Sequence, residues 1–115
     1  YVALYGSMGI ELEDYTGVSP HSTIYSAMDD FSGDYLIGPI HPEEYTNVTG
    51  GKVTIKRFTQ IGANCVIFPN LTIEEGVVVG AMSMVRKDLD SWNIYVGVPV
   101  TQLVSSRVAL SAVFM

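Results

Sequence analysis

The chain of 115 residues is long enough for one domain of ordinary size. Its six Lys and Arg residues against twelve Asp and Glu residues give a formal charge of −6, which disfavours general binding to nucleic acids or anionic membrane surfaces. Apolar residues make up 48% of the chain and charged residues 16%, and this composition excludes an intrinsically disordered protein.

Several sequence features bear on location and metal binding. No apolar stretch approaches about 20 residues, so we expect no membrane span. The start, Tyr1 to Leu4, lacks the basic region of a signal peptide, and a single Cys65 can form no internal disulfide, so we expect a cytoplasmic protein. His21 and His41 are too few for a three-histidine metal site, and no metal is expected. Because the chain begins at Tyr1 and not at Met, we expect that an upstream piece is missing.

A six-residue repeat of apolar residues begins in the front third of the chain. Leu12, Val18 and Ile24 follow at intervals of six, accompanied by the series Leu4, Ile10, Thr16 and Ser22. Ile55 lies 31 residues after Ile24, one more than five repeats, so the repeat is interrupted. The interval 26–52 is rich in Gly, Pro, Asp and Asn, and we predict that it forms one long excursion loop. Long loops inside compact domains are usually functional.

From Ile55 onward the repeat is regular. Every sixth residue is Ile or Val in the series Ile55, Ile61, Ile67, Ile73, Val79 and Val85. A second series holds smaller residues: Thr59, Cys65, Leu71, Val77, Ser83 and Leu89. A helix would space its apolar residues by 3.6, so the period predicts triangular coils whose strands pair in parallel, roughly 4.8 Å apart. We therefore predict an all-β chain with a parallel β-helix domain over 1–100 and an apolar tail over 101–115.

The repeat region resembles a known family. The runs 61–81, 83–89 and 95–99 are similar to the repeats and closing turn of the hexapeptide-repeat acyltransferases, above all the sugar O-acetyltransferases related to the galactoside, maltose and capsule or lipopolysaccharide enzymes. Residues 26–33 and 42–45 resemble loop segments of one branch of that family. The resemblance implies a left-handed parallel β-helix, assembly as a homotrimer, and acetyl-CoA bound in a groove between subunits. A short prism with open ends is marginal alone, so energetics also favour oligomers.

Acetyl transfer needs a general base near the acceptor, and histidine suits this task because its pKa lies near neutral pH. His41, in the sequence Ile-His-Pro of the loop, resembles the family's His-Pro motif and is our candidate for the catalytic base. His21 is a weaker alternative, and a base in missing upstream coils is another. Asp29 and Asp30 are candidates for binding the hydroxyl groups of a sugar acceptor, although paired carboxylates in a loop are often only turn formers.

The resemblance also assigns residues to the CoA side. Gly80 and Ala81 offer backbone groups along which the pantetheine arm can run. Lys87, with Arg86 beside it, is suited to bind phosphate. The closing turn of the family near the nucleotide corresponds here to Gly97 and Pro99.

Two functions from different classes follow from the sequence. The first is a CoA-dependent O-acetyltransferase that transfers an acetyl group to a hydroxyl of a sugar or sugar-like acceptor. The alternative is a truncated, catalytically inactive β-helix that serves as a scaffold or binding module. The alternative is favoured by the apolar tail and by departures from the family pattern at Met82, Arg86 and Val100. In both, Cys65 is expected to be a buried structural thiol.

Overall fold

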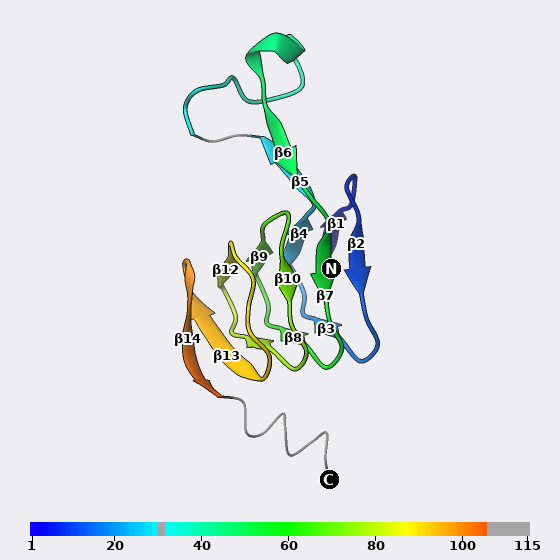
Figure 1. Cartoon of the computed structure of the whole chain (residues 1–115), viewed down its shortest axis with the longest axis vertical. Coiled ribbons are helices and arrows are strands. Elements are labelled where there is room, and N and C mark those ends of the chain that lie inside the picture. Colours follow the sequence, from blue (N-terminus) through cyan, green and yellow to red (C-terminus); the bar gives the residue numbers. More distant parts are fainter. Residues whose placement is uncertain (30–31, 106–115) are drawn as a thin grey trace.

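The computed structural model describes residues 1–29 and 32–105, and its strands wind into a three-sided prism (Figure 1). The first face contains β1 (Ala3–Tyr5), β4 (Thr23–Tyr25), β9 (Val66–Ile67) and β12 (Met84–Val85). The second face contains β2 (Ile10–Leu12), β7 (Val53–Ile55) and β10 (Thr72–Ile73). The third face contains β3 (Gly17–Val18), β8 (Gln60–Ile61), β11 (Val78–Val79), β13 (Asn93–Gly97) and β14 (Val100–Ser105).

Neighbouring strands of the prism pair in parallel, one coil beside the next. The register aligns equivalent repeat positions, so Ile24 lies beside Ile67 and Ile67 beside Val85. The exception is β14, which pairs with β13 in the antiparallel sense. The predicted fold class is confirmed: the chain is a left-handed parallel β-helix interrupted by one long loop.

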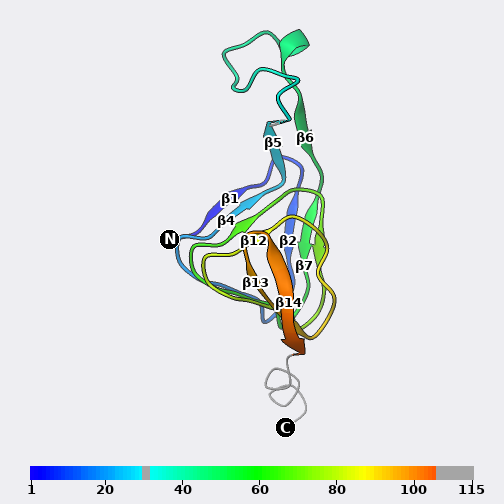
Figure 2. The same cartoon turned by 90° about the vertical axis from the view of Figure 1, so that its left-hand side faces the viewer.

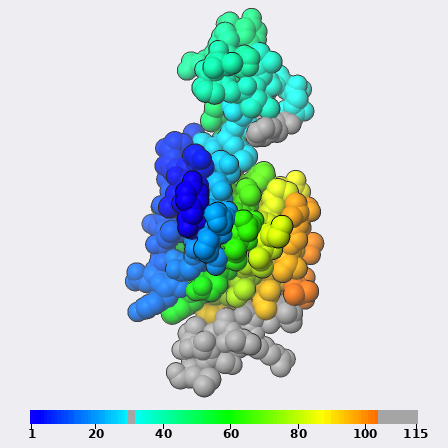
Figure 3. Space-filling model, turned by 180° about the vertical axis from the view of Figure 1, so that it is seen from behind, coloured from blue at the N-terminus to red at the C-terminus, as the bar shows by residue number. Residues whose placement is uncertain are grey.

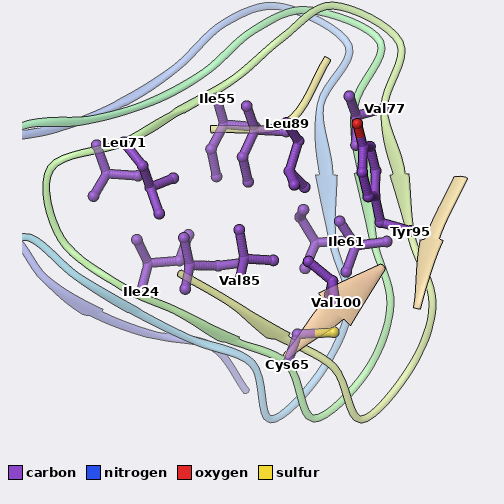
Figure 4. Close-up of a cluster of buried hydrophobic side chains, with 14 residues drawn as sticks. Ile24, Ile55, Ile61, Cys65, Leu71, Val77, Val85, Leu89, Tyr95 and Val100 are labelled. Atoms are coloured by element: carbon purple, nitrogen blue, oxygen red, sulfur yellow. The ribbon is translucent and has the colours of Figure 1, made fainter. Parts of the chain in front are cut away.

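Most of the core of the prism comes from the two predicted inward series, and Val53, Tyr95 and Val100 complete it (Figure 4). From Ile24 onward, the Ile and Val side chains at the six-residue positions are at most 1% exposed: Ile24, Ile55, Ile61, Ile67, Ile73, Val79 and Val85. The second series is also buried from Ser22 onward, and its polar members there have hydrogen-bond partners. The Ser22 hydroxyl donates to the Gly62 carbonyl at 2.8 Å, and the Thr59 hydroxyl donates to the Glu74 carbonyl at 3.1 Å. These bonds remove the cost of burying a hydroxyl.

The first coil differs from the later coils. Leu4 is 51% exposed and Leu12 is 42% exposed, although both occupy repeat positions that are buried in later coils. Each of these side chains has a neighbouring coil on one side only, as β1 pairs with β4 and β2 with β7. Burial in a β-helix therefore depends on stacking as well as on the repeat.

The edges between faces are turns that place one residue at positive φ. We call the edge between the second and third faces the Trp92 corner, and it carries Tyr15, Phe58, Gly76 and Trp92 on successive coils. Gly76 has φ of 72°, and a Cβ built on it would lie 2.1 Å from a carbon of the Trp92 ring. The indole therefore occupies the place that a side chain at position 76 would take. Its ring centroid comes within 6.4 Å of that of Phe58.

The last coil is closed by β13 and β14. Tyr95 of β13 is 5% exposed, and its hydroxyl accepts a hydrogen bond from the Asp90 amide at 3.0 Å. β14 lies along β13 as far as Ser105. Residues 106–115 of the expected apolar tail lie outside the described part of the chain, so the division at residue 100 stays a prediction.

The long loop leaves the prism after β4 and rejoins it at β7, as the interruption of the repeat predicted. It rises on a two-stranded stem, β5 (Ala27–Asp29) and antiparallel β6 (Val48–Gly50), and carries one 3-10 turn, η1 (Glu43–Tyr45). In two views the loop stands well clear of the coils (Figures 1 and 2), and the space-filling view shows it as a separate knob above the prism (Figure 3).

The root of the loop is held by Ser26, which is fully buried. Its hydroxyl donates to the Tyr5 carbonyl at 2.9 Å and accepts from the Met8 amide at 2.8 Å. Its carbonyl accepts from the Gly51 amide at 2.8 Å, on the returning strand. Ser26 thus joins both arms of the loop root to the first coil.

Candidate functional site

One candidate site lies at the C-terminal end of the edge between the first and second faces. We call this edge the hairpin corner because the loop leaves from it. A hollow of about 610 Å³, the terminal hollow, is lined by Phe68, Arg86, Lys87, Pro99, Val100 and Thr101. Phe68 and Arg86 follow β9 and β12, and the other half of the lining comes from the link into β14. The predicted CoA-binding residues Lys87 and Pro99 therefore lie in one hollow.

The distribution of ion pairs singles out this hollow electrostatically. Three cations pair with carboxylates around the second face: Lys52 with Glu11 at 3.4 Å, Lys56 with Glu74 at 3.2 Å, and Arg57 with Glu75 at 3.2 Å. Within residues 1–29 and 32–105, the remaining cations, Arg86 and Lys87, have no carboxylate partner, and both line the terminal hollow. Two exposed, unpaired cations beside apolar walls are suited to a ligand with phosphate groups.

A second hollow adjoins the first. The hairpin hollow, of about 300 Å³, is lined by Met28, Thr49, Gly50, Phe68, Pro69, Asn70 and Arg86. Phe68 and Arg86 belong to both linings, so they form a shared wall. A ligand in the terminal hollow and another in the hairpin hollow would meet at this wall.

A third hollow lies within the loop. The loop hollow, of about 330 Å³, is lined by Asp29, Gly38, Pro39, His41, Glu43, Thr46 and Val48. It brings together His41 and Asp29, the predicted base and one predicted acceptor ligand, although twelve positions separate them in sequence. The chain closes around them through the β5–β6 pairing and a bridge between Leu36 and Thr46. The other predicted acceptor ligand, Asp30, lies outside the described residues.

The predicted site residues are divided between separate regions of one chain. The loop hollow and the terminal hollow share no lining residue. Gly80 and Ala81 lie on the edge between the third and first faces, and neither lines the terminal hollow. A Cβ on Gly80 would meet Val96 Cγ1 at 2.5 Å, so close packing against the next coil already requires glycine here. Gly97 is exposed, and its amide donates to the Ser83 hydroxyl at 3.1 Å.

The weaker histidine candidate occupies a turn of the first coils. His21 is exposed at positive φ, on the edge between the third and first faces, and its ring lies 5.8 Å from that of Tyr1. It lines none of the three hollows described above. Among the described residues, no side chain forms a hydrogen bond or ion pair that would orient the His21 imidazole as a general base.

Cys65 is buried in the core, as predicted for a structural thiol. Its thiol donates to the Gly80 carbonyl at 3.1 Å. Burial raises the pKa of Cys65, and backbone hydrogen bonds near Ser83 and Met82 oppose this only in part. The thiol is therefore protonated at neutral pH and unsuited to nucleophilic attack.

Residues 1–29 and 32–105 lack two further kinds of feature, a metal-binding cluster and a membrane-spanning helix. No group of three His, Cys, Asp or Glu side chains is arranged to hold a metal ion. No helix in this part is long and apolar enough to cross a membrane.

Sequence reasoning missed several residues of the hollows, including Phe68, Thr49 and Thr101. Phe68 and Arg86 are 18 residues apart, one full coil, and the repeat places them side by side on the hairpin corner. That spacing was the signal that could have paired them. Thr49 and Thr101 come from segments outside the repeat, and no sequence signal pointed to them.

No family model matches the chain. It is 33% identical over 99 residues to a dTDP-4-amino-4,6-dideoxy-D-glucose acyltransferase from Escherichia coli, an alignment that covers 86% of this chain and 52% of that protein. The chain thus spans about half the length of this curated relative.

Solved structures give the same kind of match. The N-acyltransferase AntD from Bacillus cereus, in complex with dTDP and 3-hydroxybutyryl-CoA, is 50% identical with a TM-score of 0.90, covering 99% of this chain and 63% of that one. A galactoside acetyltransferase in complex with coenzyme A is 21% identical with a TM-score of 0.73, covering 92% of this chain and 50% of that one, and it supports the fold alone.

Proposed function

We propose a function from one premise: the chain is related to the hexapeptide-repeat acyltransferases, as its sequence predicts and its relatives confirm. The proposed reaction is transfer of an acyl group from a coenzyme A thioester to an amine of a nucleotide-linked amino sugar. The sequence analysis predicted a hydroxyl acceptor. We prefer an amine because two relatives with more than 30% identity are an amino-sugar acyltransferase and an N-acyltransferase.

The observation that carries this proposal is the terminal hollow with its two unpaired cations. Lys87 and Arg86 provide charge-assisted hydrogen bonds for the phosphates of CoA. Phe68 and Pro99 provide apolar contact for the rest of the molecule. The acceptor occupies the adjoining hairpin hollow, which shares Phe68 and Arg86 with the terminal hollow.

A homotrimer belongs to the same proposal. Outward side chains on the first face (Val66, Met84) and on the third face (Val78, Ile94, Val96) are apolar and half-buried, whereas the second face carries the three ion pairs. Packing of first and third faces between copies would bury this surface. It would also let Gly80, Ala81 and Gly97 of one copy line the groove of its neighbour, which they do not line in their own chain.

The proposed chemistry assigns the base to the loop. A neutral amine attacks the thioester carbonyl carbon, the carbon–sulfur bond breaks, and the thiol of CoA leaves as the amide forms. His41 accepts the proton that the amine loses, and Asp29 and Asp30 bind the sugar. Since the loop stands clear of its own prism, we assign His41 to the site of a neighbouring copy. A cytoplasmic location, where acyl-CoA is made and used, completes the proposal.

The test begins with a calorimetric titration of acetyl-CoA into the purified protein, whose mass in solution is measured first. We expect saturable binding with about one site per subunit. Lys87→Ala should weaken this binding about tenfold to a hundredfold, because a charge-assisted hydrogen bond is lost. The matched control Lys56→Ala removes a cation of the second face and should leave the affinity unchanged. A folded protein that binds no acetyl-CoA would contradict the proposal and leave the scaffold alternative.

Activity is then measured with acetyl-CoA and either dTDP-4-amino-4,6-dideoxyglucose or a galactoside. Acylation of the amino sugar is expected, whereas acetylation of the galactoside alone would restore the hydroxyl acceptor that the sequence predicted. His41→Ala should lower kcat about 10²- to 10⁴-fold without changing acetyl-CoA affinity. An unchanged rate in His41→Ala would remove His41 from the mechanism, and His21→Ala would then be measured.

A further inference from the structure

Ser22 and Ser26 make the same pair of side-chain hydrogen bonds. Both serines are fully buried. The Ser22 hydroxyl donates to the Gly62 carbonyl at 2.8 Å and accepts from the Cys65 amide at 3.2 Å. The Ser26 hydroxyl likewise donates to one carbonyl of the first coil, at 2.9 Å, and accepts from one amide of that coil, at 2.8 Å. Because the bonds match in number and burial, we expect the two hydroxyls to contribute similarly to the stability of the chain.

The two serines differ in what is attached to them. Ser22 and both of its partners lie within the coils. In contrast, β5 follows directly after Ser26, and the Ser26 carbonyl accepts a hydrogen bond at 2.8 Å from the amide of Gly51, the residue after β6. Both strands of the stem are therefore joined to the prism at Ser26.

Gly51 is held from its other side by a later coil. The Asn70 amide donates to the Gly51 carbonyl at 3.1 Å. A Cβ built on Gly51 would lie 2.5 Å from the side-chain oxygen of Asn70, so this close approach requires glycine. The adjoining Gly50 is also tightly packed, since a Cβ there would lie 2.9 Å from the Met8 sulfur. The root of the stem thus occupies a defined place between the first coil and the turn at Asn70.

The stem, which rises from the prism in Figure 1, forms one wall of the hairpin hollow. The lining of this hollow divides between the stem, with Met28, Thr49 and Gly50, and the hairpin corner, with Phe68, Pro69, Asn70 and Arg86. The separation between the stem and the corner therefore sets the width of the hollow. At the root this separation is fixed by Gly51, which is bonded to Ser26 through its amide and to Asn70 through its carbonyl.

The terminal hollow does not depend on the stem. Its lining comes from residues that follow β9 and β12 and from the link into β14, and it includes no residue of β5 or β6. A displaced stem would therefore change the shape of the hairpin hollow and leave the hollow assigned to CoA as it is.

We propose that Ser26 is a positioning residue of the acceptor site. Its hydroxyl and carbonyl hold the stem at the distance from the hairpin corner that gives the hairpin hollow its width, although Ser26 itself lines none of the three hollows. This inference rests on the proposed placement of the acceptor in the hairpin hollow. It adds to that placement a residue that acts on the acceptor only through the stem.

The first test compares Ser26→Ala with the matched control Ser22→Ala. Both variants should lower Tm by similar amounts, because each loses two buried hydrogen bonds. Ser26→Ala should raise the KM for dTDP-4-amino-4,6-dideoxyglucose about fivefold to fiftyfold, since a small displacement of a binding wall misplaces the substrate. The Kd for acetyl-CoA, measured by calorimetry, should stay unchanged. Ser22→Ala should change neither the KM nor the Kd.

A second pair of variants displaces the stem without removing a side-chain hydrogen bond. Gly51→Ala places a methyl group against the Asn70 side chain, which should push the stem away from the corner and raise the acceptor KM as Ser26→Ala does. The matched control is Gly17→Ala in β3, whose methyl group meets the side-chain amide of Gln60 on the third face. This control should leave the acceptor KM unchanged. The pair keeps the proposal testable if Ser26→Ala does not fold.

Hydrogen exchange measures the stem without any substrate, and the Gly51 amide should exchange faster in Ser26→Ala than in Ser22→Ala. Equal exchange at Gly51 in the two variants would overturn the inference. So would an equal change of the acceptor KM in both serine variants, or an unchanged KM in both Ser26→Ala and Gly51→Ala. If the wild type acylates the amino sugar while these variants match their controls, the positioning role alone is wrong. If the wild type acylates no amino sugar, the proposed function fails as well.

Discussion

Inside the prism almost every large apolar side chain of the repeat is hidden from water, whereas the loop exposes most of its own. Ile67 and Ile73 are fully buried, while Ile40 of the loop is 89% exposed and Val48 of its stem 59%. The coils therefore stabilise themselves through the hydrophobic effect, and the loop obtains little of this stabilisation from its own chain. The difference teaches that the loop contributes little to the stability of its own chain, whereas the coils contribute most of it.

The largest expected effect compares one isoleucine from each region. Ile67→Ala should lower the free energy of unfolding by about 2 to 5 kcal/mol, because it deletes a fully buried side chain and leaves a cavity. Ile40→Ala should change it by at most about 0.5 kcal/mol. Urea unfolding followed by circular dichroism measures both. Equal destabilisation by the two variants would mean that the loop side chain is covered in the native assembly.

The next effect compares two glycines with positive φ. Gly76→Ala should cost about 1 to 3 kcal/mol, since the new methyl overlaps the Trp92 ring and the backbone strain is added. Gly33→Ala in the loop has φ of 97° and open space around it, so only the strain, about 1 kcal/mol, remains. Thermal unfolding gives the costs, and Trp92 fluorescence should shift in Gly76→Ala alone. A fluorescence spectrum unchanged by Gly76→Ala would contradict the packing of Trp92.

The smallest effect concerns the thiol of Cys65, whose pKa is raised by burial. The folded protein keeps this proton to a higher pH than the unfolded chain does. Stability should therefore be unaffected by this group below the ordinary thiol pKa, and should fall as the pH rises from there toward the raised value. Reaction with a thiol reagent at pH 8 should be slow in the wild type, while Ile40→Cys should add one fast-reacting thiol. Rapid reaction of both thiols would show that the prism opens readily.

Much of the prism could be predicted from the sequence because a β-helix repeats one local environment. A residue six positions along faces the same interior, so Ile55 and its successors were identified as core from spacing alone. The loop limits followed from the phase shift between Ile24 and Ile55. Exposure of Leu4 and Leu12 did not follow, because it depends on which coils stack beside them. The left-handed sense of the coils was predicted from the family resemblance, because a six-residue spacing does not distinguish left-handed from right-handed coils.

The candidate site was less predictable because its lining combines residues of the six-residue repeat with residues of the loop and of β14, which have no repeat. Lys87 and Pro99 share a hollow only because β14 folds back on β13. His41 and Asp29 come together through the stem pairing and the Leu36–Thr46 bridge, neither of which has a repeat. Their roles, like those of Asp30, Gly80, Ala81 and Gly97, stay predictions until the variants above are measured.

Ser26 restricts how the loop can move relative to the prism. One hydroxyl joins the Tyr5 carbonyl to the Met8 amide, and the carbonyl of the same residue receives the Gly51 amide. The departing arm, the returning arm and the outermost coil are thus tied at a single buried point. The loop cannot swing as a free arm, because a change in its tilt must either break these hydrogen bonds or move the first coil with it.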